Sequence, residues 1–183
     1  LTVIDSIFVK PCLTNQSRGR YTDGAEEWGV FTNPSPMAAN NNAFERYANT
    51  PNFSTAPGFY PSSVSVTLST TEQNAEIYYT TDGSYPNIGS NLYTNPIDIS
   101  ATTVVKATTV SANAQILNSF MEYGTFFINE TFTMPVLSVS GDEIDELLSG
   151  DEIKPLGTFE YYKQNGELAD KARGEFNEHG NDS

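Results

Sequence analysis

Three tyrosines are the residues whose type and spacing most directly suggest chemistry in this chain. Tyr79, Tyr85 and Tyr93 follow one another at short intervals in a segment rich in β-branched residues. An aromatic ring offers an apolar face on which a sugar ring can stack, while its hydroxyl stays polar. Tyr78 and Tyr79 point to opposite faces of one strand, so one of them should enter a core. The three tyrosines are therefore a candidate carbohydrate-binding site, and tyrosines that cap a sheet edge are the structural alternative.

Carboxylates form the second candidate site. Asp142, Asp145 and Glu146 lie in an acidic run, and carboxylate oxygens are the ligands that Ca²⁺ prefers. Their spacing departs from that of a calcium-binding helix–loop–helix motif. A solvated acidic face of a short helix over residues 141–150 explains them without an ion, because acids in the first turn suit the helix dipole. Ca²⁺ is the only cofactor that the sequence suggests, and no cofactor is the preferred interpretation.

Catalytic and zinc chemistry lack the necessary side chains. His179 is the only histidine and Cys12 the only cysteine, so a zinc site with nitrogen and sulfur ligands cannot form. Asp182 and Ser183 follow His179 closely, but the members of a catalytic triad usually come from distant segments. We interpret His179 as structural. The sequence predicts no catalytic residue and no internal disulfide.

The composition excludes some partners. The chain has 183 residues and a formal net charge of −14, whereas binding to nucleic acid needs clusters of Lys and Arg. No apolar run is long enough to span a membrane. The acidic balance is typical of an extracellular protein that stays soluble by self-repulsion. The chain opens without a signal sequence, and we expect it to be a window cut from a longer polypeptide.

Residues 77–86 organise the rest of the chain. Their β-branched and aromatic residues predict a strand that runs into a tight turn at Asp82 and Gly83, and Pro86 cannot continue a central strand. This turn explains Asp82 without a bound cation. Further strands are expected over residues 64–69, 97–99, 103–110 and 116–128. Together they predict a mainly β, antiparallel sandwich of the immunoglobulin or fibronectin-III type, with one face of each sheet wet.

The central region resembles a known family. The matching runs are IYYTTDGSYP at residues 77–86, SNLYTNPIDI at 90–99 and TVVKA at 103–107. They are similar to the chitobiase/β-hexosaminidase C-terminal-type domain, a fibronectin-III-like accessory module of bacterial secreted proteins. The resemblance implies a sandwich over residues 53–130 and brings no catalytic residues with it.

The flanking regions resemble two other families. SRGRYTDG at residues 17–24 and FTNPSP at 31–36 resemble the end of a lamin-tail-like domain, from which Ser35 and Met37 depart. This similarity implies an incomplete β domain over residues 1–40, followed by a linker over 41–52. PVLSV at 135–139 and FEYY at 159–162 resemble the opening of a CotH-like, kinase-related domain, which implies an incomplete α+β segment over 131–183.

These observations favour a non-catalytic structural or interaction module of a secreted or cell-surface bacterial protein. The combination of resemblances implies a Gram-negative bacterium of the Bacteroidetes kind. The expected partners are other domains of the parent chain and surface or secretion-system proteins. Two alternatives stay open: a carbohydrate-binding accessory module, and the N-terminal part of a CotH-like enzyme whose active site lies outside this chain.

Overall fold

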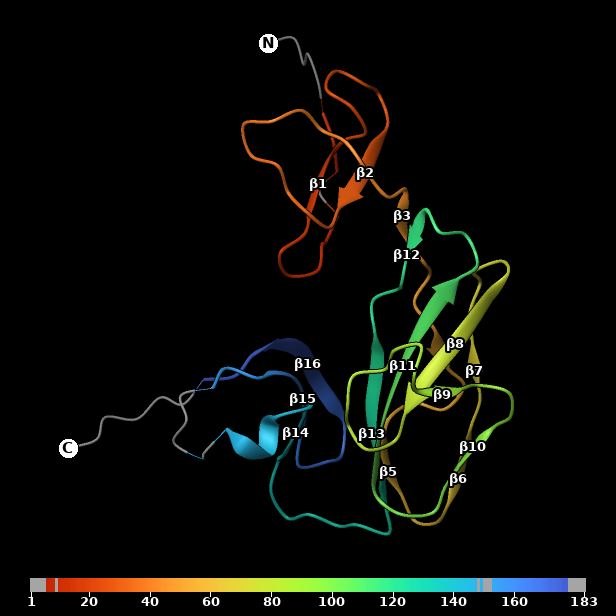
Figure 1. The fold of residues 1–183 in the computed structure, drawn as a ribbon. Helices are drawn as coiled ribbons and strands as arrows, with labels where there is room; N and C mark the ends of the chain where they lie inside the picture. The colour runs from red at the N-terminus through yellow and green to blue at the C-terminus, as the bar shows by residue number, and fades with distance from the viewer. Residues whose placement is uncertain (1–5, 9, 148, 150–152, 178–183) are drawn as a thin grey trace, which may run out of the picture.

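The computed structural model describes residues 6–8, 10–147, 149 and 153–177. The chain is mainly β, as predicted, and most of its strand pairs are antiparallel. Figure 1 shows a central sandwich, a small hairpin on its N-terminal side and a separate sheet formed by the C-terminal segment. These three parts position every candidate residue discussed below.

A five-stranded sheet forms the larger layer of the sandwich. Its order is β5, β13, β11, β8 and β9, and all neighbours are antiparallel except β5 and β13. The strands are β5 (Gly58–Tyr60), β8 (Ala75–Thr80), β9 (Asn91–Leu92), β11 (Thr103–Ser111) and β13 (Glu122–Ile128). The parallel pair is possible because the rest of the sandwich connects β5 to β13, and a parallel connection needs a long crossover.

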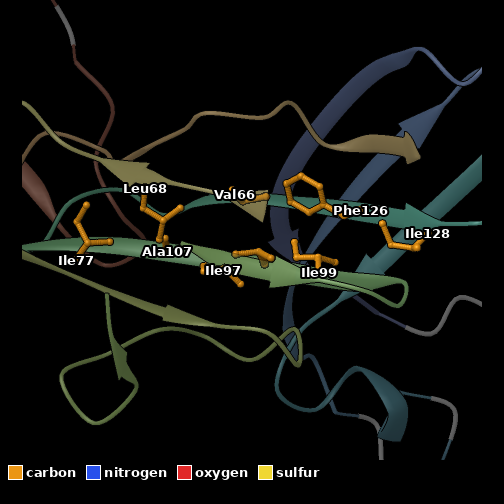
Figure 2. Packing of buried hydrophobic residues seen from close by; sticks show 9 residues of the cluster. Val66, Leu68, Ile77, Ile97, Ile99, Ala107, Phe126 and Ile128 are labelled. Carbon is orange, nitrogen blue, oxygen red and sulfur yellow. The ribbon is translucent and has the colours of Figure 1, made fainter. Parts of the chain in front are cut away.

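Two short strand pairs form the opposing layer. β4 (Asn52–Phe53) pairs with β7 (Leu68–Ser69), and β6 (Val64–Val66) pairs with β10 (Ile97–Ile99). Figure 2 shows the apolar side chains of both layers meeting between them. The core residues alternate along their strands, so they share one face. They are Val66, Leu68, Ile77, Ile97, Ile99, Val105, Ala107, Phe126 and Ile128.

The C-terminal segment forms a three-stranded antiparallel sheet. Its strands are β14 (Val136–Ser140), β15 (Leu156–Tyr162) and β16 (Leu168–Glu175), with β15 in the centre. Gly166 has a φ of +82° in the turn between β15 and β16, a conformation that favours glycine. In Figure 1 this sheet lies beside β13, on the side of the sandwich away from β6 and β10.

The helix expected over residues 141–150 differs in the structure. The described part of this segment holds a single turn of 3-10 helix, η1 (Ile144–Glu146), while Leu148 and Gly150 lie outside the described residues. A helix this short is costly to nucleate, because the first turn orders several residues for one hydrogen bond. The α+β character expected for this segment is therefore not observed in the described residues.

We expected one face of each sheet of the sandwich to be exposed to solvent, and this expectation is wrong for β11 and β13. Lys106, Thr108 and Thr125 point away from the apolar core, yet each is at most 5 % exposed. The C-terminal sheet covers Lys106 and Thr125, as the contacts below demonstrate, whereas Thr108 bonds to Ser119 in the connection before β13. β11 and β13 are therefore buried on both sides, and the structure has three layers at this point, whereas Glu76 in β8 and both residues of β9 are exposed.

The N-terminal part is joined to the sandwich by backbone pairing. β1 (Ser17–Arg20) and β2 (Trp28–Phe31) form an antiparallel hairpin, and β3 (Arg46–Tyr47) pairs in parallel with β12 (Ile116–Leu117). Arg46 also donates two hydrogen bonds to the Glu72 carboxylate, at 2.8 and 2.9 Å. Part of the predicted linker is thus an extended segment bonded to the sandwich.

Candidate functional site

The most distinctive site is a polar seam between the sandwich and the C-terminal sheet. We define the seam by the residues that face each other across it. Lys106, Tyr123 and Thr125 come from β11 and β13, and Ser138, Ser140, Thr158, Glu160, Tyr162, Lys171 and Arg173 come from β14, β15 and β16. Alternate residues of a strand share a face, so both sheets present a row of polar groups to each other.

Glu160 is the centre of the seam. Its side chain accepts hydrogen bonds from the Thr125 hydroxyl at 2.5 Å and from the Tyr162 hydroxyl at 2.7 Å. Thr125 also bonds to the Ser138 hydroxyl at 2.7 Å, and its carbonyl lies 3.3 Å from the Tyr162 hydroxyl, so Thr125 makes three contacts across the two sheets. Glu160 and Thr125 are each 2 % exposed, and Tyr162 is fully buried. Buried polar groups need such partners, because an unsatisfied one costs about 1–3 kcal/mol.

Lys106 is a fully buried cation in the same seam. Its ammonium donates to the Ser140 carbonyl at 3.2 Å and lies 4.8 Å from the centre of the Tyr85 ring. Within the described residues, no carboxylate forms a salt bridge with it at 4.0 Å or less. Burial lowers the pKa of Lys106 to about 8, although Asp142 and Asp82 oppose that shift by their negative charge.

Lys171 connects the two sheets at the edge of the seam. Its ammonium pairs with the Glu122 carboxylate and donates to the Tyr123 carbonyl at 3.1 Å. It also lies 4.6 Å from the centre of the Tyr123 ring, and burial raises the pKa of Tyr123 to about 12. The Lys171–Glu122 pair is about one-third exposed, so we expect it to contribute less than the buried bonds of Glu160.

An aromatic cluster closes the other end of the seam. Phe59 stacks on Phe127 with ring centres 4.5 Å apart, and Tyr162 meets both rings edge-on at 5.3–5.5 Å. Phe132, in the connection to β14, packs against the same two phenylalanines. Edge-to-face and offset aromatic pairs are favourable beyond the area that they bury. The seam therefore combines directional hydrogen bonds with apolar packing.

The structure separates the three tyrosines that the sequence grouped. Tyr79 and Tyr93 lie together, with ring centres 6.3 Å apart and nearly perpendicular, and both pack on the apolar core. Tyr85 lies in the seam, where the centre of its ring is 4.8 Å from the Lys106 ammonium and 5.1 Å from the central carbon of the Arg173 guanidinium. A flat surface built from all three rings is thus absent among the described residues.

The predicted carboxylate group is also spread out. Asp142 accepts a hydrogen bond from the Tyr85 backbone N–H at 2.8 Å, whereas Asp145 and Glu146 are exposed in η1. Among the described residues, no group of three or more His, Cys, Asp or Glu side chains could hold a metal ion. His179 lies outside the described residues, and Cys12 is half-buried and free.

The turn residues contribute to the seam. The Asp82 carboxylate accepts hydrogen bonds from the Ser84 backbone N–H at 3.0 Å and the Ser84 hydroxyl at 2.5 Å. Gly83 has a φ of +84° and is buried against Ser140 of the C-terminal sheet. Pro86 follows directly after Tyr85 and is half-buried. The loop after β8 is therefore held between the two sheets.

Sequence reasoning missed the seam, although one signal for it exists. Lys106 stands in the middle of an otherwise apolar and threonine-rich strand, TVVKATTVS. A charged residue in the interior of a strand is rarely buried without a polar surrounding, so it marks a second buried face. The partner of that face lies about 30 or more residues away and has no local signature.

The chemistry available to the seam is that of a structural contact. Its central groups, Glu160, Thr125 and Tyr162, are buried and bonded to one another, and the described residues bring no nucleophile, base and orienting group together as catalysis would need. No helix in the described part of the chain is long and apolar enough to cross a membrane.

Comparison with known proteins gives one match. The model of the family described as "Chitobiase/beta-hexosaminidase C-terminal domain" matches residues 55–117, from the entry to β5 through β12. No curated protein and no solved structure matches the chain. The match covers about a third of the chain and leaves the flanking segments unmatched, so their lamin-tail-like and CotH-like character stays a prediction. That domain is an accessory module of glycosidases, and the central sandwich of this chain is accordingly similar to a non-catalytic module.

Proposed function

We propose that this chain is a non-catalytic structural module of a secreted or cell-surface bacterial protein, in which the sandwich fixes the orientation of its neighbours. The observation that carries the proposal is the buried seam, where Glu160, Thr125 and Tyr162 satisfy one another across two sheets. The family match to an accessory module and the charge of −14 support the same role.

The seam suits rigid coupling better than a flexible connection. Inter-domain contacts are mobile by default unless they are large and well packed. Separation of the two sheets would remove the Ser140 carbonyl from Lys106 and the Thr125 hydroxyl from Glu160, and it would expose the Phe59–Phe127–Tyr162 cluster. Hydrogen bonds also depend on direction, so this interface resists rotation as well as separation.

A distance measurement between spin labels tests the coupling. Asn95 in the sandwich and Ala169 in β16 are both exposed, and each can be replaced by cysteine after Cys12→Ser removes the native thiol. We expect a single narrow distance distribution. A seam variant that combines Glu160→Ala with Thr125→Ala should broaden it, while Glu160→Gln, which keeps an acceptor, should not. A broad distribution in the unaltered seam would refute the proposal.

Carbohydrate binding is the second candidate function. It is favoured by the match to an accessory module of glycosidases and by the adjacency of Tyr79 and Tyr93. Binding that also used Tyr85 would need this ring to leave its contacts with Lys106 and Arg173. Affinity electrophoresis on chitin, cellulose and algal glycans, with Tyr79→Ala and Tyr93→Ala as variants, distinguishes this candidate from the structural one.

Two experiments on the parent protein test whether it is exported to the cell surface and whether it continues into a CotH-like domain. Protease treatment of intact cells should degrade the sandwich if it lies at the cell surface. Sequencing beyond Ser183 should reveal acidic metal-binding motifs if the segment after residue 131 opens a CotH-like domain.

A further inference from the structure

The C-terminal sheet carries polar side chains on its inner side and apolar side chains on its outer side, which is the reverse of the usual arrangement. Its inner side, against the sandwich, carries Ser138, Ser140, Thr158 and Glu160, all bonded in the seam. Its opposite side, which we call the outer face, carries Leu137, Val139, Phe159, Tyr161 and Ala172. A sheet with one wet side normally buries its apolar residues and exposes its polar ones.

The strand register gathers these apolar residues into one patch. Leu137 is paired with Tyr161, and Val139 is paired with Phe159, which is in turn paired with Ala172. Ile144 and Phe176 lie against Gly157 at one end of the patch, where a Cβ atom would be 2.7 Å from either side chain. At the other end, Leu137 is 61 % exposed and Tyr161 is 40 % exposed.

Acidic residues lie next to this apolar patch. Glu143, Asp145 and Glu146 are exposed in or beside η1, and Asp170 is exposed opposite Tyr161. An apolar centre with a charged rim is the usual anatomy of a protein interface. The rim is unfavourable for a second copy of this chain, because like charges would face each other.

The dimensions of the face fit a helix. Three strands span about 10 Å between the outer two, which matches the diameter of about 10–12 Å of an α-helix with its side chains. Five paired residues are about 16 Å long, the length of a helix of about 11 residues. A helix on a sheet is one of the stable layer arrangements of proteins.

We propose that the outer face of the C-terminal sheet docks a separate polypeptide partner, through an amphipathic helix with an apolar stripe and basic flanks. The partner's apolar stripe covers Leu137, Phe159 and Tyr161, and its basic residues meet the acidic rim. The inner side of the sheet is used in the seam, so this interface is independent of the coupling proposed above.

A designed peptide tests this interface. The probe is a fluorescent helical peptide of about 14 residues, with leucine at helical spacing and lysine elsewhere. Fluorescence anisotropy at about 0.3 M salt, which screens unspecific attraction, should give saturable binding of one peptide per chain. A double variant, Leu137→Ser with Tyr161→Ser, should weaken binding about tenfold or more. Asp170→Lys, which leaves the apolar patch intact, should weaken it less.

A matched control separates the outer face from other apolar residues. Ile88 and Leu92 are also exposed, and the double variant Ile88→Ser with Leu92→Ser should bind the peptide as the unaltered chain does. Equal binding to both double variants, or equal binding of a leucine–glutamate peptide, would overturn the proposal. A reversible dimer in sedimentation that disappears in the Leu137–Tyr161 variant would also overturn it, because a second copy would then be the occupant.

Discussion

Replacement of Lys106 by methionine should stabilise the folded chain at neutral pH. Methionine is also unbranched, one heavy atom shorter than lysine, and removes the charge of this fully buried side chain. The pKa of Lys106 is lowered from 10.5 to about 8 in the folded state. A shift of this size corresponds to roughly 3 kcal/mol, which is the amount by which the charged form weakens folding below pH 8.

The pH dependence follows from the direction of this shift. Between about pH 8 and 10.5 the unfolded state binds more protons than the folded state at Lys106, so stability rises with pH there. Burial raises the pKa values of Tyr123 and Tyr162, so above about pH 10 the unfolded tyrosines lose protons first and stability falls again. The unaltered chain should therefore be most stable near pH 10.

Urea unfolding followed by circular dichroism measures both effects. At pH 7, Lys106→Met should unfold at a higher urea concentration than the unaltered chain, with a gain of about 2–3 kcal/mol that shrinks towards zero near pH 10. Lys106→Arg is the control, because its charge cannot be lost and no such rise with pH should occur. Stability that stays constant between pH 8 and 10 in the unaltered chain, together with no gain for Lys106→Met, would refute the reasoning.

Three further predictions concern other contacts. Thr125→Val should lower the free energy of unfolding in urea by about 2–3 kcal/mol, because Glu160 loses a donor inside the seam. Glu160→Gln should lower it by about 1 kcal/mol or less. Equal losses for the two variants would contradict the hydrogen-bond network. Phe126→Ala should cost about 3–5 kcal/mol and lower the melting temperature, since the ring is fully buried in the sandwich core. A double-mutant cycle of Arg46→Ala and Glu72→Ala should give a coupling of about 0.5–1 kcal/mol that falls with added salt, because the Arg46 side chain is 45 % exposed although that of Glu72 is nearly buried. A coupling near zero would show that this pair does not hold the N-terminal segment.

Local sequence determined the strands and the apolar core of the sandwich. The alternation in residues 103–110 identifies Val105 and Ala107 as sharing a face, and both are fully buried in the core. The Asp82–Gly83 pair indicates a chain reversal after β8, and Gly83 has the positive φ that such a turn uses. Alternation and turn chemistry depend on neighbouring residues, so they can be recognised without knowledge of distant contacts.

Only the tertiary structure decided what covers each face. Tyr79 and Tyr85 look equivalent as aromatic residues near one turn, yet Tyr79 packs on the core and Tyr85 contacts two cations in the seam. The pattern in β15 indicates which residues share a side, but not that Glu160 faces inward while Tyr161 faces solvent. The physical reason is that a strand's alternation defines two faces without assigning either to a core. That assignment depends on which distant sheet packs against it, and here the partner of Lys106 and Thr125 lies in another part of the chain.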